Sequence, residues 1–155
     1  KLGGFHFNDS KYGDDDLTAG ALKPYQLFLI FNELVEGMDA RGMNHAKDLG
    51  WMIDASHNVK DPLEDLIQSL EAIQEAYAKA LLVDQKALKN AQLENDVVLC
   101  QEILQGAYRT DVRPLLAEAR LISGGVLNPI QAFRSLNVRG QLIKERGKNT
   151  VATGL

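Results

Sequence analysis

Two short apolar runs, each followed by a polar segment and an amphipathic helix, dominate the first half of the chain. Residues 2–8 alternate aromatic side chains with His6, which predicts a short buried strand. Residues 50–55 repeat this pattern and close on an acid. Pro24 and Pro62 then stand where a first helical residue needs no N–H donor. The pattern therefore predicts two consecutive strand–helix units.

Apolar residues at three- and four-residue intervals give both helices an expected core-facing stripe. The first helix is predicted from Pro24 to near Gly42, and the second follows Asp61, which with Glu64 forms a variant of the capping box. The stripe of the first helix comprises Leu27, Ile30, Phe31, Leu34, Val35 and Met38. The stripe of the second comprises Leu63, Leu66, Ile67, Leu70, Ile73, Tyr77, Leu81 and Leu82.

Strand patterns stop after residue 83, and only helical patterns follow. Helices are expected at about 85–94, 96–108, 111–122 and 129–146. Strand–helix–strand order favours parallel strands joined by a helical crossover, yet two parallel strands cannot form a stable sheet alone. The predicted fold class is therefore α/β. Residues 1–83 would form the last two βα units of a (β/α)8 TIM barrel, residues 84–148 an all-helical C-terminal extension, and residues 149–155 a disordered tail.

Composition narrows the functional classes. The 155 residues are 45% hydrophobic and carry a formal net charge of -4, with scattered basic residues, which gives no electrostatic reason to bind nucleic acid. No apolar run is long enough to cross a membrane. The single Cys100 lies in an apolar helical pattern and is expected to be a packed thiol without a disulfide partner. These features predict a soluble cytoplasmic protein.

Candidate metal ligands follow the first strand and end the second. The sequence GGFHFNDSKYGDDD presents His6 and then the adjacent carboxylates Asp14, Asp15 and Asp16, while Asp54 closes the second apolar run. Functional groups in parallel sheets gather at the carboxyl ends of the strands, so these side chains can converge. We predict that His6, Asp14, Asp16 and Asp54 are metal ligands. Asp14 and Asp16 are two residues apart and can face the same ion, whereas Asp15 between them would point elsewhere in extended backbone. Such a mixed nitrogen and oxygen set suits Mn²⁺, Mg²⁺ or Co²⁺.

Simpler interpretations of the same residues stay open at this point. The three aspartates could form a solvated acidic turn, and His6 alone could be a hydrogen-bonded core histidine. His57 could cap the following helix, support the site or contact a substrate. We expect His45 to be a solvated loop residue and assign it no role. An EF-hand is a poor alternative, because its regular ladder of acids and its distal glutamate are missing.

Three peptides carry a resemblance to a known family. GGFHFNDSKYGDDDLTAG, KPYQLFLIFNELVEG and WMIDASHNVKDPLEDLIQS resemble the C-terminal part of the L-rhamnose isomerases of the bacterial broad-specificity type, within the xylose-isomerase-like barrel superfamily. The resemblance covers residues 3–70. It implies that the two strands are the seventh and eighth of a barrel whose following helices help to assemble a homotetramer. It also implies two divalent metal ions, commonly Mn²⁺.

The resemblance assigns roles residue by residue. His6 and Asp54 would bind the metal that anchors the substrate hydroxyls, and Asp14 and Asp16 would bind the second metal beside the reacting carbons. Asp16 and Asp54 would be catalytic, and Asp54 and His57 would contact the sugar. The family's bridging glutamate and its further aspartate and histidine come from earlier strands that this chain does not contain.

The expected activity is the interconversion of L-rhamnose and L-rhamnulose by a metal-assisted hydride shift, without an organic cofactor. Because part of the metal site comes from the remainder of the barrel, we expect the isolated chain to be inactive. Two alternatives remain. One is another sugar isomerase or epimerase of the same superfamily, and the other is a non-catalytic helical interaction module.

Overall fold

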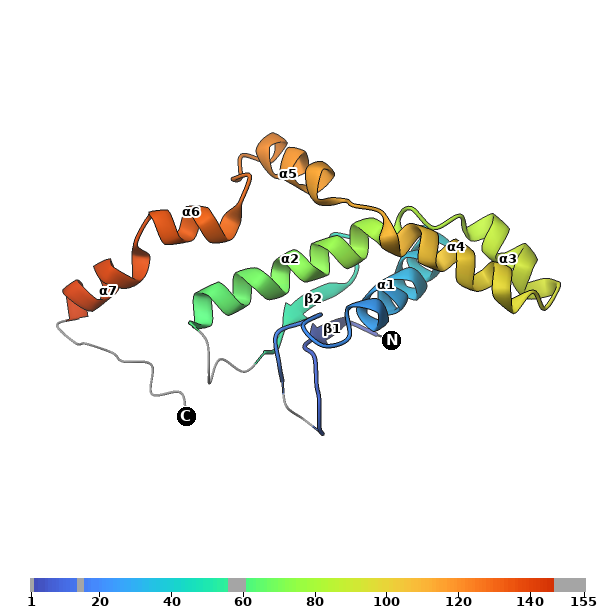
Figure 1. Ribbon diagram of the computed structural model, residues 1–155, viewed down its shortest axis with the longest axis horizontal. Helices are drawn as coiled ribbons and strands as arrows, with labels where there is room; N and C mark the ends of the chain where they lie inside the picture. Colours follow the sequence, from blue (N-terminus) through green and yellow to red (C-terminus); the bar gives the residue numbers. More distant parts are fainter. Residues whose placement is uncertain (1, 14–15, 56–60, 147–155) are drawn as a thin grey trace.

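The computed structural model describes residues 2–13, 16–55 and 61–146, which form two strands and seven helices (Figure 1). The elements, in chain order, are β1 (Gly4–Phe7), α1 (Pro24–Asp39), β2 (Gly50–Ile53), α2 (Pro62–Ala80), α3 (Gln85–Leu93), α4 (Val97–Arg109), α5 (Arg113–Ile122), α6 (Pro129–Ser135) and α7 (Val138–Arg146). The expected tail, residues 149–155, lies outside the described residues.

The two strands pair in parallel, as predicted, with Gly4 opposite Gly50 and Phe7 opposite Ile53. Each strand is four residues long, so the expected strand 2–8 is too long at both ends and the expected strand 50–55 is too long at its C-terminal end. Alternation along β1 turns Phe7 toward the helices, where it is buried, and leaves His6 exposed. Met52, the partner of His6, is likewise exposed. Among the described residues, therefore, the helices cover one face of the sheet and the other face is open.

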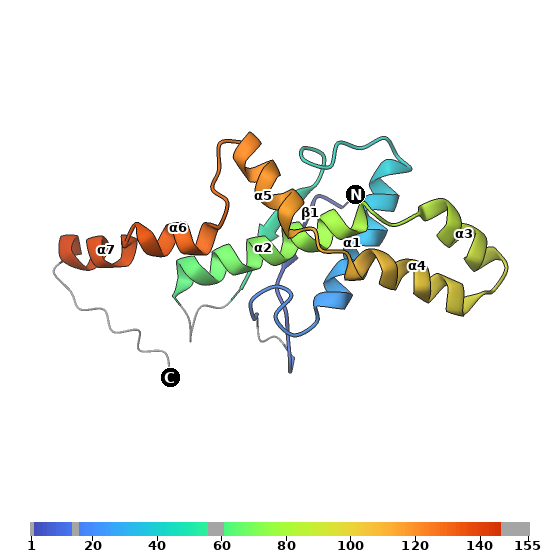
Figure 2. The same ribbon diagram turned by 45° about the horizontal axis from the view of Figure 1, so that its top comes forward.

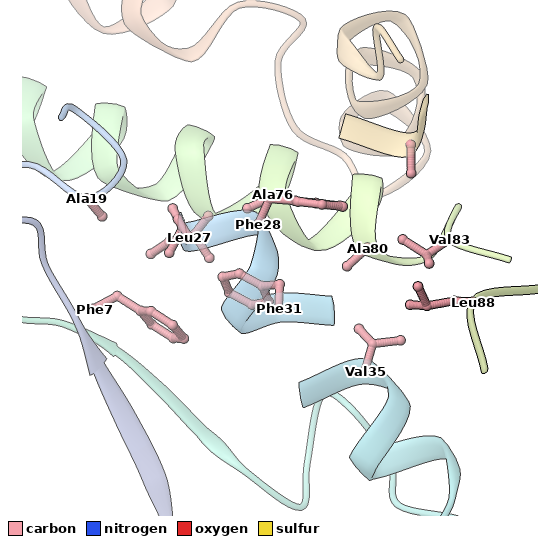
Figure 3. Packing of buried hydrophobic residues seen from close by; sticks show 12 residues of the cluster. Phe7, Ala19, Leu27, Phe28, Phe31, Val35, Ala76, Ala80, Val83 and Leu88 are labelled. Carbon is pink, nitrogen blue, oxygen red and sulfur yellow. The ribbon is translucent and has the colours of Figure 1, made fainter. Parts of the chain in front are cut away.

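Stacked aromatic rings join the sheet to the two long helices. Phe31 of α1 stacks on Phe7 and on Trp51, with ring centroids 5.0 Å apart in both pairs. Figure 3 shows Phe7 and Phe31 side by side in a buried cluster that continues through Val35 toward Leu88 of α3. Phe7 and Phe28 belong to this cluster, Trp51 packs against it, and Cys100 packs against it as expected.

The expected core stripe of α2 is confirmed at Ile73 and wrong at its N-terminal leucines. Leu63, Leu66 and Leu70 are 41%, 41% and 47% exposed. The side that packs on α1 instead carries Asp65, Ser69, Ile73, Ala76 and Ala80, all of which are buried. Small and polar residues fit there because α1 and α2 lie side by side in both ribbon views (Figures 1 and 2). The leucine stripe therefore has no cover within the described residues.

Helix α1 departs from its predicted face at several positions. Ile30 is half-exposed, whereas Asn32 is buried and accepts a 2.6 Å hydrogen bond from Gln85 at the start of α3. The helix ends at Asp39, and the chain reverses at Gly42, which has φ +60°, a conformation that glycine adopts at little cost. The predicted stop near Gly42 is thus confirmed.

Helix α2 begins with half of the predicted capping box. Oδ1 of Asp61 accepts hydrogen bonds from the backbone N–H groups of Leu63 and Glu64, as expected of an N-cap. The side chain of Glu64, however, binds Arg134 of α6 through two hydrogen bonds of 2.8 and 2.6 Å. A bidentate guanidinium is a stronger partner for a carboxylate than a single backbone N–H.

Helices α5, α6 and α7 form an extended C-terminal arm beside α2 rather than a packed layer (Figure 1). The helix expected at 129–146 is in fact two, α6 and α7, because Asn137 adopts φ +47° between them. No residue of α5 or α6 is buried, and Ile122 is 80% exposed. No helix in the described part of the chain has the length and apolar content needed to cross a membrane.

Candidate functional site

His6 and Asp54 meet on the open face of the sheet, where the two strands end. Nδ1 of His6 lies 3.2 Å from Oδ2 of Asp54, and their side chains are 59% and 64% exposed. The backbone N–H of Asp54 donates to the carbonyl of Phe7, so strand pairing continues one residue past β2. Parallel register alone brings these two side chains together, as their positions in the sequence predicted.

Asp16 lies at the end of the loop that follows β1 and is tied to the residue directly after that strand. Its Oδ1 accepts a 2.6 Å hydrogen bond from Nδ2 of Asn8. Its backbone has φ +47°, which aspartate tolerates better than most residues. The other two predicted site residues, Asp14 and His57, lie outside the described residues.

A buried aspartate that the sequence analysis overlooked organises this loop. Asp9 pairs with Leu17 through two backbone hydrogen bonds of 2.8 and 2.7 Å, which close the loop between them. The carboxylate Oδ2 of Asp9 also accepts from the backbone N–H groups of Leu22 and Lys23, at 2.7 and 2.8 Å, just before α1. Asp9 therefore fixes both the closure of the loop and its path into the helix.

Helix α2 holds the same loop from the other side. Oγ1 of Thr18 donates a hydrogen bond to Oδ1 of Asp65, and the N–H of Ala19 donates to Oγ of Ser69 at 3.1 Å. Asp65 and Ser69 are fully buried. The sequence could have indicated these two residues, because they are four apart and share one helix face with the apolar Ile73.

His45 is not the solvated loop histidine that the sequence suggested. Its Nδ1 lies 2.8 Å from the hydroxyl of Tyr77 and its Nε2 lies 2.9 Å from Oδ1 of Asp39, while its carbonyl accepts from Nε1 of Trp51. Burial, and secondarily the charge of Asp39, raise the pKa of Tyr77. This network fixes the loop before β2, at the end of the strand away from Asp54.

The chemistry of His6 and Asp54 fits part of a divalent metal site. Two ligands at right angles around an ion, with bonds of about 2.1 Å, are about 3 Å apart, close to the separation seen here. An imidazole nitrogen with a carboxylate oxygen suits Mn²⁺, Co²⁺ or Mg²⁺. Within residues 2–13, 16–55 and 61–146, no three His, Cys, Asp or Glu side chains gather closely enough to hold an ion. The described residues thus offer two donors, not a complete site.

Comparison with known proteins gives two long similarities, while no protein-family model matches the chain. The chain is 51% identical, over 99% of its length, to a protein of Mesorhizobium japonicum named a probable sugar isomerase, and covers 35% of that protein. It is 52% identical, over 94% of its length, to a probable sugar isomerase of Rhizobium meliloti, and covers 34% of it. The chain therefore spans about a third of the length of these curated relatives.

Proposed function

We propose that this chain is the C-terminal part of a metal-dependent sugar isomerase and completes the metal site of that enzyme. The observation that carries the proposal is the meeting of His6 and Asp54 at the carboxyl ends of two parallel strands, in a chain about half identical to proteins named as sugar isomerases. Carboxyl ends of parallel strands are where sites form in α/β barrels.

We further propose that the two strands are the last of a (β/α)8 barrel. Parallel sheets are normally covered on both faces, yet the face of His6 and Met52 is open, and so is the leucine stripe of α2. If the complete polypeptide is as long as these relatives, its remaining two thirds would cover the open face of the sheet and the leucine stripe. The exposed apolar residues of α5, among them Ile122, would then contact other copies in a homotetramer, which light scattering on the complete protein can test.

The proposed reaction is the interconversion of L-rhamnose and L-rhamnulose, because three peptides of the chain resemble L-rhamnose isomerases. Two divalent ions, with Mn²⁺ the first candidate, would polarise the carbonyl of the sugar and lower the pKa of its neighbouring hydroxyl. His6 and Asp54 would hold one ion, and Asp14 and Asp16 the other. Asp54 and His57 would orient the sugar. Asp16, tied to Asn8, would stand beside the carbons between which hydrogen moves.

Isomerisation of L-rhamnose by the complete polypeptide, with and without Mn²⁺, tests the proposal. We expect His6→Ala and Asp54→Ala each to lower activity by roughly 100-fold or more, because each removes a ligand. Asp48→Ala, which removes an exposed aspartate from the loop before β2, should retain activity. Wild-type activity in both ligand variants would contradict the site. Activity on a different sugar alone would favour another isomerase or epimerase of the superfamily, and no metal binding at all would favour an interaction module.

A further inference from the structure

The loop that carries Asp16 is fastened immediately after that residue. Leu17 pairs with Asp9, Thr18 donates to Asp65, and Ala19 donates to Ser69. These three consecutive residues therefore connect the loop first to the end of β1 and then to the first turns of α2. The position of Asp16 relative to β1 is set on its other side by the hydrogen bond from Asn8.

Asp65 is an unusual choice for the place it occupies. Its side chain is fully buried, and taking a carboxylate out of water costs several kcal/mol before its partners compensate. The next residues along the same face of α2, Ile73 and Ala76, show that apolar residues suit the packing with α1. Well-packed apolar residues commonly stabilise a core as well as a buried polar pair does. Asp65 also lies in the first turn of α2, where the helix dipole favours a negative charge, but packing against α1 does not by itself require a polar residue here.

We propose that Thr18, Asp65 and Ser69 are positioning residues, which hold Asp16 at a fixed place relative to His6 and Asp54. None of the three is a ligand in this proposal. They act through the backbone of the loop, by fixing the two residues that follow Leu17 to a rigid helix. The inference rests on the proposed function, because it concerns the metal site to which Asp16 belongs, and it adds residues that the resemblance does not assign.

The decisive variant removes the connection while sparing the fold. Replacing one partner leaves the other buried and unsatisfied, whereas replacing both by apolar residues of similar shape can be nearly neutral for stability. The double variant Thr18→Val, Asp65→Leu in the complete protein should therefore melt within a few degrees of wild type. We expect Mn²⁺ titrations followed by electron paramagnetic resonance to show one of the two binding steps weakened about tenfold. It should be the same step that Asp16→Asn weakens.

Three single variants complete the design: Ser69→Ala is a test variant, and Thr18→Ser and Ser123→Ala are controls. Thr18→Ser keeps the hydroxyl and should retain wild-type Mn²⁺ affinity. Ser69→Ala removes the acceptor of the Ala19 N–H and should weaken the step that depends on Asp16. Ser123→Ala removes an exposed hydroxyl that binds the carbonyl of Ala119, far along α5, and should change neither step.

The outcomes separate this inference from the function on which it rests. If the wild-type protein binds no Mn²⁺, or if His6→Ala does not weaken binding, the proposed function fails. If His6→Ala weakens binding but the double variant binds both ions as wild type does, only the positioning role is overturned. Should the double variant fail to fold, Ser69→Ala decides, and affinity equal to that of Ser123→Ala overturns the positioning role.

Discussion

The pair formed by Glu64 and Arg134 is the contact that fastens α6 to the start of α2. Hydrogen bonds from Arg134 hold the pKa of Glu64 below its usual 4.5, with a smaller contribution from the charge of Arg139. A carboxylate whose pKa is lower in the folded than in the unfolded chain contributes stability above its unfolded pKa. That contribution is lost as the pH falls through the lowered, folded-state pKa.

This pair predicts a measurable pH effect at a single residue. In Arg134→Gln, the pKa of Glu64 should rise toward 4.5, because the two hydrogen bonds to the charged form are gone. An NMR titration of the Glu64 side chain between pH 2 and 7 would measure the change in its pKa. Arg139→Gln is the matched control and should move the pKa less. An unchanged pKa in Arg134→Gln would contradict the pairing.

At the scale of residues, the sequence predicts the positions of side chains that lie at the ends of strands and helices. His6 and Asp54 could be expected together because register and chain order fix their places, and Asp61 could be expected as a cap because its role is local. Asp65 and His45 could not, although the 47 and 32 residues that separate them from their partners are no more than the 48 between His6 and Asp54. Such pairings depend on how α1 and α2 pack, which spacing along one helix does not reveal.

At the scale of elements, the two adjacent glycines of the first strand have different roles. A Cβ on Gly4 would lie 2.7 Å from the carbonyl oxygen of Gly50, whereas a Cβ on Gly3 would meet nothing within 4 Å. The two strand backbones thus approach closely at only one position of this pair. The approach is at Gly4, where β1 and β2 begin to pair.

Gly4→Ala should therefore disturb the sheet, and Gly3→Ala should not. We expect Gly4→Ala to lower the free energy of unfolding by about 1–3 kcal/mol, because backbone atoms cannot move aside as a side chain can. Gly3→Ala is the matched control and should lie within about 0.5 kcal/mol of wild type. Urea unfolding of the complete protein measures both values. Equal values for the two variants would mean that the strands do not approach at Gly4.

The misplaced stripe of α2 has a physical cause at the same scale. Periodicity marks which residues of a helix are apolar, but it does not say which apolar side meets which neighbour. Helix α2 has a buried side of mostly small and polar residues against α1, and a partly exposed side of leucines. The sequence pattern favoured the leucines because they are larger. In the structure, α1 packs on the side that carries Ile73 and the small residues, not on the side of the leucines.

At the scale of the molecule, charge and apolar surface are distributed unevenly. Residues 113–155 contain seven Lys and Arg and two Glu, whereas most of the acids precede them. Helices α5 and α6 lie against α2 through pairs such as Arg120 with Glu71 and Arg134 with Glu64. The arm is thus attached by charge rather than by a buried core, as expected of a segment whose apolar residues contact something else.

The leucine stripe of α2 gives the sharpest test of whether a larger barrel surrounds this chain. Leu70 is 47% exposed here, so Leu70→Ala would cost little if the described residues were its whole environment. In the complete protein we expect it to lower the free energy of unfolding by about 2–5 kcal/mol, as burial under a neighbouring unit would require. Ile73→Ala, which removes a buried side chain from the same helix, is the reference for a fully covered site. A small effect of Leu70→Ala beside a large effect of Ile73→Ala would mean that no further unit packs on this face.

The 155-residue chain alone should show no isomerase activity, since it holds only part of the proposed site. Turnover of the sugar by the isolated chain would mean that no further unit is needed for catalysis.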